Sequence, residues 1–418
     1  MNVARSLAAL GLLLGLSPAA LAAPLDDYIV MKAAEKINLA CGGLKYFEHE
    51  RTLAAAADYL GQTSQNRLSL DGRLTEPDYN AWLAEQTAKV DAAVAAAGCT
   101  QAAYAYLLPA KARAAEEIYR DLALAFHFAQ MPEGSLERLK IDNQQVLASQ
   151  GFEAYLRQLY GEGFDTFAAR QREIASSELP AANPFGQGGF GLGTTLGTMI
   201  TDPDAMMKNS SLRMEGGDAL RKVHFEVAAE ASGLLVRPFV VGDRTLAQLV
   251  HPAGAEPPLT IVEGPSYLLF DPEPDNDTQA DRVELSSATG LSPDGGLRVM
   301  FFGDAALAHL TNATVRLYAR TTPLPSAVSS WEMFDREDWR AGTTMFEGVR
   351  SSATCLGAPC FDFPPEATEA LTAFTQGDYA ELFVSPRPAD DRDFFQARYR
   401  PGKFSNYYTW LVRKGTGS

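Results

Sequence analysis

The sequence has few cysteines, few histidines and few basic residues for its length. Four cysteines and five histidines among 418 residues leave little material for a zinc site, which needs clustered pairs of these ligands. Lys and Arg number 36 against 52 Asp and Glu, so the formal net charge is −16 at pH 7. Such a diffuse negative field repels phosphate backbones and anionic lipid surfaces. The charge balance therefore argues against nucleic acid as a partner and against electrostatic docking on membranes.

The sequence also lacks the short motifs that identify many enzymes. It contains no H-E-x-x-H, no G-x-S-x-G and no C-x-x-C-H. The glycine-rich run at 186–197 is not followed by the lysine of a phosphate-binding loop, and we interpret it as a flexible arm. Among the histidines only His224 has an acidic neighbour, Glu226, on the same face of an expected strand, and this pair is a candidate for acid–base chemistry or metal binding. A dispersed Ser-His-Asp triad stays open, because its members need not be adjacent in sequence.

An apolar stretch at the start of the chain predicts a secretory signal peptide over residues 1–22. Arg5 supplies the positive start, residues 7–16 form the apolar core, and Ala20 and Ala22 stand at the spacing of a cleavage site, which we expect after Ala22. This core is too short to remain as a membrane span, and no later stretch approaches the ~20 apolar residues of a transmembrane helix. We therefore expect a periplasmic or secreted bacterial envelope protein that has no transmembrane anchor and meets no nucleotide.

Four cysteines in an exported chain predict two disulfides. Of the three pairings we favour the one that keeps each bridge within its own region, Cys41 with Cys99 and Cys355 with Cys360. The first bridge closes a long loop, which is worth roughly 4 kcal/mol if it acts through the entropy of the unfolded chain. The second closes the tight CLGAPC loop, whose spacing does not match a C-x-x-C redox motif.

Residues 23–180 are expected to form a helical bundle. Ala, Leu, Glu, Gln and Arg dominate, and apolar residues recur at helical spacing, as at Ile118 and Leu122. Gly42 and Gly43 should break or kink the first helix, and the first disulfide should clamp the first two helices together. The expected helices lie near 26–60, 75–97, 110–131, 135–149 and 151–177.

The character of the chain changes after residue 180. Residues 181–220 contain prolines and the glycine run, and we expect a linker or arm there. From 221 to 418 the hydrophobic period is two, as where Val315, Leu317 and Ala319 alternate with polar neighbours. These patterns predict an α+β chain of two domains, in which the disulfide-clamped helical bundle precedes an all-β, sandwich-like or barrel-like domain.

An acidic loop in the second region is a candidate calcium site. Calcium takes about six to eight oxygen ligands, and this loop alternates oxygen-bearing side chains. The pattern departs from an EF-hand loop where Asn276 and Arg282 stand at positions six and twelve. A solvated acidic turn between two strands is the alternative interpretation. The candidate ligands are Asp271, Glu273, Asp275, Asp277 and Asp281.

A cluster of aromatic and acidic residues at 329–340 is a candidate ligand-binding segment. Trp331, Phe334 and Trp339 stand among four carboxylates, so exposed rings could stack on a sugar while the carboxylates bond its hydroxyls. Paired carboxylates at suitable separation could also hydrolyse a glycosidic bond. The alternative is an amphipathic turn of helix with the three rings packed inward.

These observations favour an exported, non-catalytic envelope protein that binds or assembles with a partner protein or a glycan. One alternative is a secreted hydrolase acting on glycans or esters, with its site at the junction of the two regions or around 329–340. A further alternative is a carbohydrate-binding β-module with structural calcium. We expect no cofactor other than that calcium.

Overall fold

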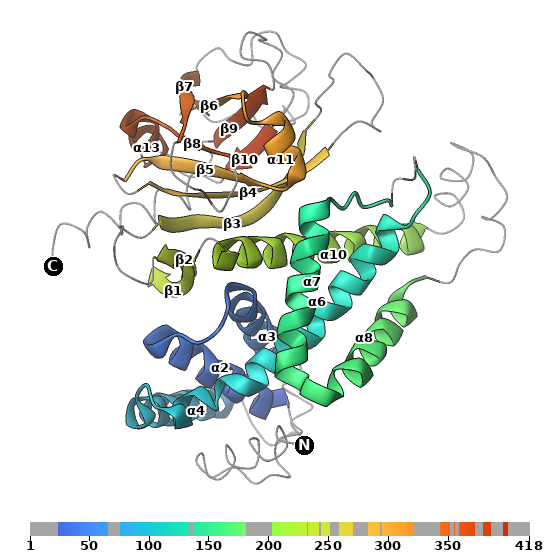
Figure 1. Cartoon of the computed structure of the whole chain (residues 1–418). Coiled ribbons are helices and arrows are strands. Elements are labelled where there is room, and N and C mark those ends of the chain that lie inside the picture. Colours follow the sequence, from blue (N-terminus) through green and yellow to red (C-terminus); the bar gives the residue numbers. More distant parts are fainter. Residues whose placement is uncertain are drawn as a thin grey trace.

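A helix-rich N-terminal region is followed by a curled antiparallel sheet, and a long helix, α10 (Pro203–Ala231), lies between the two (Figure 1). The computed structural model describes residues 24–65, 76–133, 135, 137–180, 203–231, 233–241, 244–250, 259–270, 283–292, 295–320, 343–351, 355, 359–372, 379–385 and 396–399.

Glycines set the breaks between the helices of the N-terminal region. The expected break at Gly42 and Gly43 is confirmed, since both have positive φ and two helices end and begin on either side of them. The expected boundary near residue 150 is wrong, because one helix runs through it and the chain turns at Gly161 instead, with φ of 56°. The helices are α2 (Pro24–Cys41), α3 (Tyr46–Gln65), α4 (Glu76–Ala97), α5 (Gln101–Tyr104), α6 (Leu107–Ala129), α7 (Asn143–Tyr160) and α8 (Phe164–Glu178), with a 3-10 turn at Gly161–Gly163.

Both expected disulfides are formed. Cys41 at the end of α2 is bonded to Cys99 just after α4, with the two Cα atoms 5.3 Å apart. The two bridged helices share an apolar cluster that contains Ile37 and Ala34 of α2 and Val90 of α4. The bridge therefore ties together two helices that already share a core, as the sequence predicts.

A second apolar cluster joins α6 to the helices around it. Ile118 and Phe128 of α6 and Phe152 of α7 are fully buried there with Val223 of α10. Helix α10 crosses α6 so closely that a Cβ atom on Gly216 would lie 2.8 Å from a backbone nitrogen of α6. A residue without a side chain is thus required at this crossing.

The sheet has ten strands in the order β1-β2-β3-β4-β5-β8-β7-β6-β9-β10, and every neighbouring pair is antiparallel. Because β10 contacts β3, the sheet is curled into a half-barrel rather than flat. Two short helices, α11 (Asp304–His309) and α13 (Pro365–Thr372), follow β5 and β8. The strands are β1 (Leu235–Val241), β2 (Arg244–Val250), β3 (Leu259–Phe270), β4 (Val283–Leu291), β5 (Leu297–Phe302), β6 (Thr314–Arg320), β7 (Thr343–Arg350), β8 (Cys360–Asp362), β9 (Tyr379–Ser385) and β10 (Gln396–Tyr399).

The helical part of the chain extends further than the sequence predicts. Residues 203–220, expected within a linker, and 221–231, expected within the β region, together form α10. The period-two pattern of Val223 and Phe225 resembles a strand, but Leu220 and Val223 also stand at helical spacing. Packing on α6 and α7 decides in favour of the helix.

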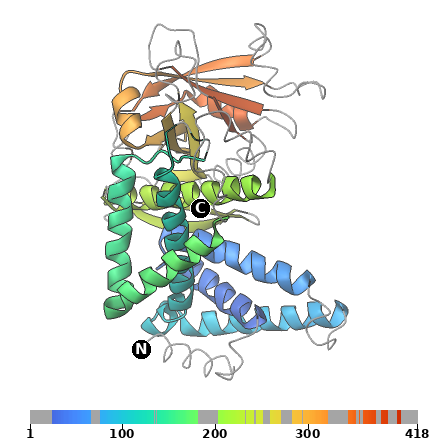
Figure 2. The ribbon, with the colours of Figure 1, turned by 90° about the vertical axis from the view of Figure 1, so that its right-hand side faces the viewer.

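Helix α10 belongs to both parts of the molecule, and Figure 2 shows it lying beneath the sheet in the side view as well. Its Phe225 contacts Tyr46 of α3, with ring centroids 5.0 Å apart, and Phe302 of β5 at 5.8 Å. The disulfide between Cys355 and Cys360 lies in the same cluster, and both cysteines are 1% exposed. The sheet and the bundle thus share one apolar joint.

Candidate functional site

Two carboxylates meet at the first turn of α3, directly beside this joint. Glu48 Oε2 accepts a hydrogen bond of 2.8 Å from the backbone N–H of Lys45, which is the reciprocal half of a capping box. Glu226 Oε2, from α10, accepts one of 3.0 Å from the next backbone N–H, that of Tyr46. The first N–H groups of a helix have no partner inside the helix and carry partial positive charge, so they attract carboxylates.

Burial and charge give the two carboxylates different surroundings. Glu48 is fully buried; it accepts a hydrogen bond from the hydroxyl of Tyr155, and Lys111 Nζ lies 3.9 Å from its Oε2. Burial and the nearby Glu48 raise the pKa of Tyr155 above its usual value. Glu226 is 3% exposed, and burial raises its pKa to about 7 even though Lys45 acts to lower it.

His49 lies one residue further along α3 and is buried. The sequence context, FEHER, indicates a solvated side chain, and this interpretation is wrong: the residue is 3% exposed. Its Nδ1 lies 3.1 Å from the side-chain nitrogen of Asn38, whose oxygen accepts from the N–H of Leu44. Burial lowers the pKa of His49 to about 4, so the imidazole is neutral at pH 7 and accepts this hydrogen bond.

A third buried acid, Asp121 of α6, is neutralised by arginines. Arg51 of α3 donates to its Oδ2, and Arg120 donates to its Oδ1 through Nε at 2.9 Å and Nη2 at 2.6 Å. The Asp121 side chain is fully buried, and a buried charge needs such partners to be tolerated. This cluster ties α3 to α6.

A separate polar group lies where α7 and α10 meet α11. Asp142 caps α7 by accepting from the N–H of Gln145 at 2.7 Å, and its other oxygen accepts from the N–H of Asp304 at 3.2 Å. His224 of α10 is 5% exposed, and its Nδ1 has no hydrogen-bond partner among the described residues. Burial lowers the pKa of His224, while Asp142 and Asp304 act to raise it.

The expected His224–Glu226 pair does not form. The two residues lie on a helix instead of a strand, where positions two apart point about 200° away from each other. Accordingly His224 faces Phe302, with ring centroids 6.2 Å apart, and Glu226 faces the start of α3. Among the residues that the structure describes, no three His, Cys, Asp or Glu side chains are placed to hold a metal ion.

One small pocket opens on the helical surface between α6, α7 and α8. It has a volume of about 70 Å³ and is lined in part by Tyr119, Glu153 and Arg172. These three already satisfy one another, because Arg172 donates to the Tyr119 hydroxyl at 2.6 Å and that hydroxyl donates to Glu153 at 3.1 Å. The pocket therefore presents a closed polar network to solvent.

Strand β7 carries exposed apolar side chains on one face. Met345 and Val349 point to the same face and are 48% and 70% exposed, with the exposed Glu347 between them. Beside Val349 stands Asp362 of β8, which accepts a hydrogen bond of 2.8 Å from Arg298. Figure 1 places β7 on the side of the sheet away from α10.

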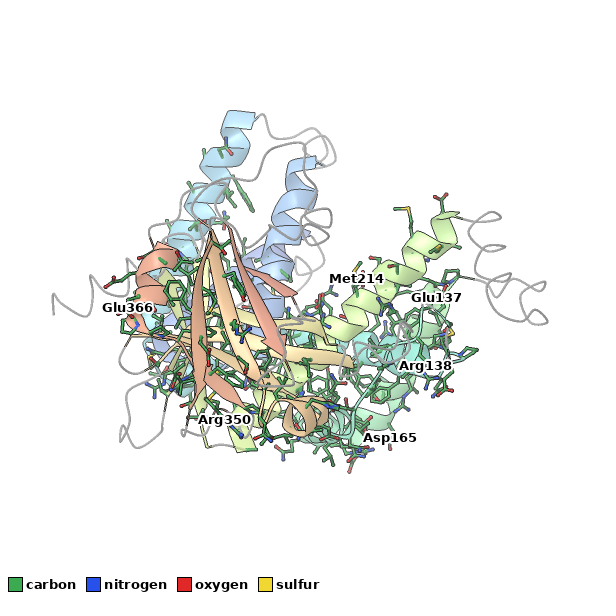
Figure 3. The ribbon with its side chains drawn as sticks, turned by 90° about the horizontal axis from the view of Figure 1, so that it is seen from above. Glu137, Arg138, Asp165, Met214, Arg350 and Glu366 are labelled. Atoms are coloured by element: carbon green, nitrogen blue, oxygen red, sulfur yellow. A yellow bond between two sulfur atoms is a disulfide. The ribbon has the colours of Figure 1, made fainter. Side chains whose placement is uncertain are left out.

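Other exposed methionines lie elsewhere. Seen from above, Met214 stands on α10, and Arg350 lies at the end of β7 on another part of the molecule (Figure 3). Met214 is 49% exposed. The surface of α10 and the β7 row are thus separate.

Several predicted sites lie outside the described residues. They are the signal peptide (1–22), the glycine run (186–197), the calcium candidates Asp271, Glu273, Asp275, Asp277 and Asp281, and the aromatic candidates Trp331, Phe334 and Trp339. These stay predictions.

Comparison of the chain with protein-family models, with curated proteins and with solved structures finds no match. Among the described helices, none combines the length and the apolar character needed to cross a membrane.

Proposed function

We propose that the chain is an exported, non-catalytic protein of the bacterial envelope that binds or assembles with a partner protein or a glycan. The two formed disulfides support export, because disulfides persist in oxidising compartments outside the cytosol. Removal of the expected signal peptide belongs to the same proposal. Intact-mass measurement of secreted material tests it: the mature chain should lack residues 1–22 and carry no free thiol.

The exposure of β7 is the observation that carries the binding function. Strand β7 is central in the sheet order, between β8 and β6, yet Met345 and Val349 stay exposed on one face. Charged groups surround them, since Glu347 lies between and Asp362 alongside. An apolar row with a polar rim is typical of a surface that another protein covers. We therefore favour the protein partner over the glycan for this face.

The inaccessibility of Glu226 and His49 supports a non-catalytic role. Groups with shifted pKa values often mark catalytic sites. Here Glu226 and His49 are each 3% exposed, and each contacts a structural group: Glu226 accepts from the α3 backbone, and His49 accepts from the Asn38 side chain. A catalytic acid or base must come within hydrogen-bond reach of its substrate. These groups are placed to hold helices together.

Chemical crosslinking in intact envelopes, followed by mass spectrometry, tests the β7 surface. Val349→Glu adds a charge at the centre of the row and should abolish the specific crosslinked adduct of the wild type. Leu147→Glu is the matched control, because Leu147 is 63% exposed on the helix α7, far from β7 in the sheet. Equal adducts with both variants, or a wild-type chain that crosslinks to nothing, would contradict this assignment.

The buried imidazole at the junction of the two regions favours a hydrolase as the second candidate. His224 lies near Asp142 and Asp304, the kind of groups that orient a general base. If the wild type turns over chromogenic glycosides or esters, and His224→Ala lowers that rate more than 100-fold while unfolding at the same temperature, the hydrolase replaces the binding protein.

A carbohydrate-binding module with structural calcium is the third proposal. It depends on the acidic loop 271–281 and on Trp331, Phe334 and Trp339. A calcium-dependent rise in melting temperature that Asp275→Asn and Asp277→Asn remove, together with retention on a glycan column, would favour it.

A further inference from the structure

The two carboxylates at the start of α3, Glu48 and Glu226, accept different numbers of hydrogen bonds. Glu48 accepts from the Lys45 N–H and from the Tyr155 hydroxyl, and Lys111 stands 3.9 Å away. For Glu226 the described contacts give one donor, the Tyr46 N–H, at 3.0 Å. Hydrogen bonds to a carboxylate favour its charged form, so Glu48 is the better stabilised anion of the two.

Two carboxylates in one buried site do not both ionise easily. Removing a charge from water is costly, and a like charge nearby adds repulsion, so one group of such a pair keeps its proton. Among the described contacts, Glu226 is the carboxylate with fewer hydrogen-bond donors. Its pKa is raised to about 7, and burial is the largest cause. Lys45 and the Tyr46 N–H oppose this rise, whereas Glu230 and Glu48 add to it.

The groups that act on Glu226 are Lys45, the Tyr46 N–H, Glu48 and Glu230. Behind Glu48 lie Tyr155 of α7, whose hydroxyl donates to it, and Lys111 of α6, whose Nζ is 3.9 Å from its Oε2. Glu50 of α3 acts together with Glu226 on the Tyr46 hydroxyl. On the sheet side Phe225 and Phe302 are apolar. Lys45 forms an ion pair with the half-exposed Glu230, so its charge is already shared.

A change of charge at Glu226 acts on the joint of the molecule. The Tyr46 N–H that bonds Glu226 belongs to the residue whose ring packs on Phe225. Phe225 in turn packs on Phe302 of the sheet. An anion at this point repels Glu48 and draws water toward a dry cluster, and both effects act against the seating of α3 on α10.

We propose that Glu226 is a proton switch, protonated while α3, α10 and the sheet pack as described and loosening that joint when it ionises in alkaline surroundings. This regulatory device goes beyond the proposed binding function and does not depend on it. Glutamine at this position would accept the same hydrogen bond at every pH, so Glu226→Gln mimics the protonated state.

Urea unfolding between pH 5 and pH 8 tests the switch. The folded state keeps a proton that the unfolded state loses above about pH 4.5, so the Glu226 contribution to stability falls as pH rises to about 7 and changes little above it. Relative to Glu226→Gln, the unfolding constant of the wild type should therefore rise about 70-fold from pH 5 to pH 8. Glu215→Gln, the same change at a half-exposed position of the same helix that is not among the groups acting on Glu226, should follow the wild type.

Two further measurements keep the outcome decisive if Glu226→Gln folds poorly. Infrared difference spectra of the wild type between pH 5 and pH 8 should show the loss of one protonated carboxyl band that the Glu226→Gln or Glu226→Ala chain lacks. Amide exchange at Tyr46 and Phe47, corrected for its intrinsic pH dependence, should accelerate over the same interval. Parallel pH profiles for wild type and Glu226→Gln, or no such band in the wild type, would overturn the proposal.

Discussion

Replacing Asp142 by alanine should weaken two helices in different parts of the molecule at once. One oxygen of this carboxylate accepts from the N–H of Gln145 and caps α7, and the other accepts from the N–H of Asp304 at the start of α11. Gln145 completes the capping box by accepting from the Asp142 N–H at 3.1 Å. A single side chain therefore links the bundle to the sheet region.

The expected loss follows from these bonds. Removing a helix N-cap costs about 1 kcal/mol, and removing a hydrogen bond to a charged group costs about 1.5–3 kcal/mol. Asp142→Ala should therefore lower the free energy of unfolding by about 3 kcal/mol. Asp142→Asn keeps an oxygen for Gln145 but turns an N–H₂ group toward Asp304, so it should lose only the second contribution, about 2 kcal/mol. Gln145→Ala, which leaves both oxygens in place, should cost about 1 kcal/mol or less.

Urea unfolding gives these differences, and amide exchange assigns them to the two ends. In Asp142→Asn the Asp304 amide should lose protection while the Gln145 amide keeps it, and in Asp142→Ala both should lose it. A free energy of unfolding of Asp142→Ala within about 0.5 kcal/mol of the wild-type value would refute the reasoning. Equal protection of the Asp304 amide in the wild type, Asp142→Asn and Asp142→Ala would refute it as well.

Two other predictions concern packing and redox behaviour. Gly216→Ala should cost about 1–3 kcal/mol in urea unfolding, because its new Cβ meets the backbone of α6. A Cβ at Gly217 meets only side-chain atoms, the end of Arg221 at 3.2 Å and Leu139 at an ordinary contact distance of 3.7 Å, so Gly217→Ala should be neutral or stabilising. Under dithiothreitol, mass spectrometry after alkylation should show the Cys41–Cys99 bridge opening before the second disulfide, because Cys99 is exposed while both cysteines of the second bridge are 1% exposed. Simultaneous opening would contradict this order.

The parts of the fold that local rules govern could be predicted from the sequence. The break at Gly42 and Gly43, the helix at 76–97 and both disulfide pairings follow from glycine conformation, helical spacing and the position of the cysteines. The change to short antiparallel strands also appears in the pattern, and the sheet is confirmed. Its closure into a half-barrel depends on contacts such as that of β10 with β3, which no local pattern contains.

The errors have physical reasons. Ser135 was the expected start of a helix, but Asp142 is the true cap because Gln145 stands three residues on and completes the box. His49 was expected in solvent because its neighbours are charged, yet those neighbours also have partners inside the molecule: Glu48 accepts from Tyr155 of α7, and Glu50 interacts with Lys222 of α10. A charged side chain is therefore a guide to solvent exposure only where the fold offers it no buried hydrogen-bond or ion-pair partner.

The candidate site could not be predicted, since its bonds cross long stretches of chain. Glu226 and Tyr46 are 180 residues apart in sequence, and Tyr155 and Glu48 are 107 apart. One local signal was present: Glu48 stands three residues after Lys45, shortly after two glycines, and this is the spacing of a capping box.

The choice of glutamate at position 226 needs a reason other than the fold. Leucine there would leave the Tyr46 N–H without an acceptor, at a cost of about 1–3 kcal/mol, so some acceptor is required. Glutamine would meet that need at any pH and carry no charge into the joint. Glutamate accepts this bond in either state, and more strongly as the anion, but above neutral pH it places a charge beside Glu48 and against an apolar cluster. A residue that lowers stability in one range of pH, where a neutral isostere would not, is what a pH-dependent joint requires.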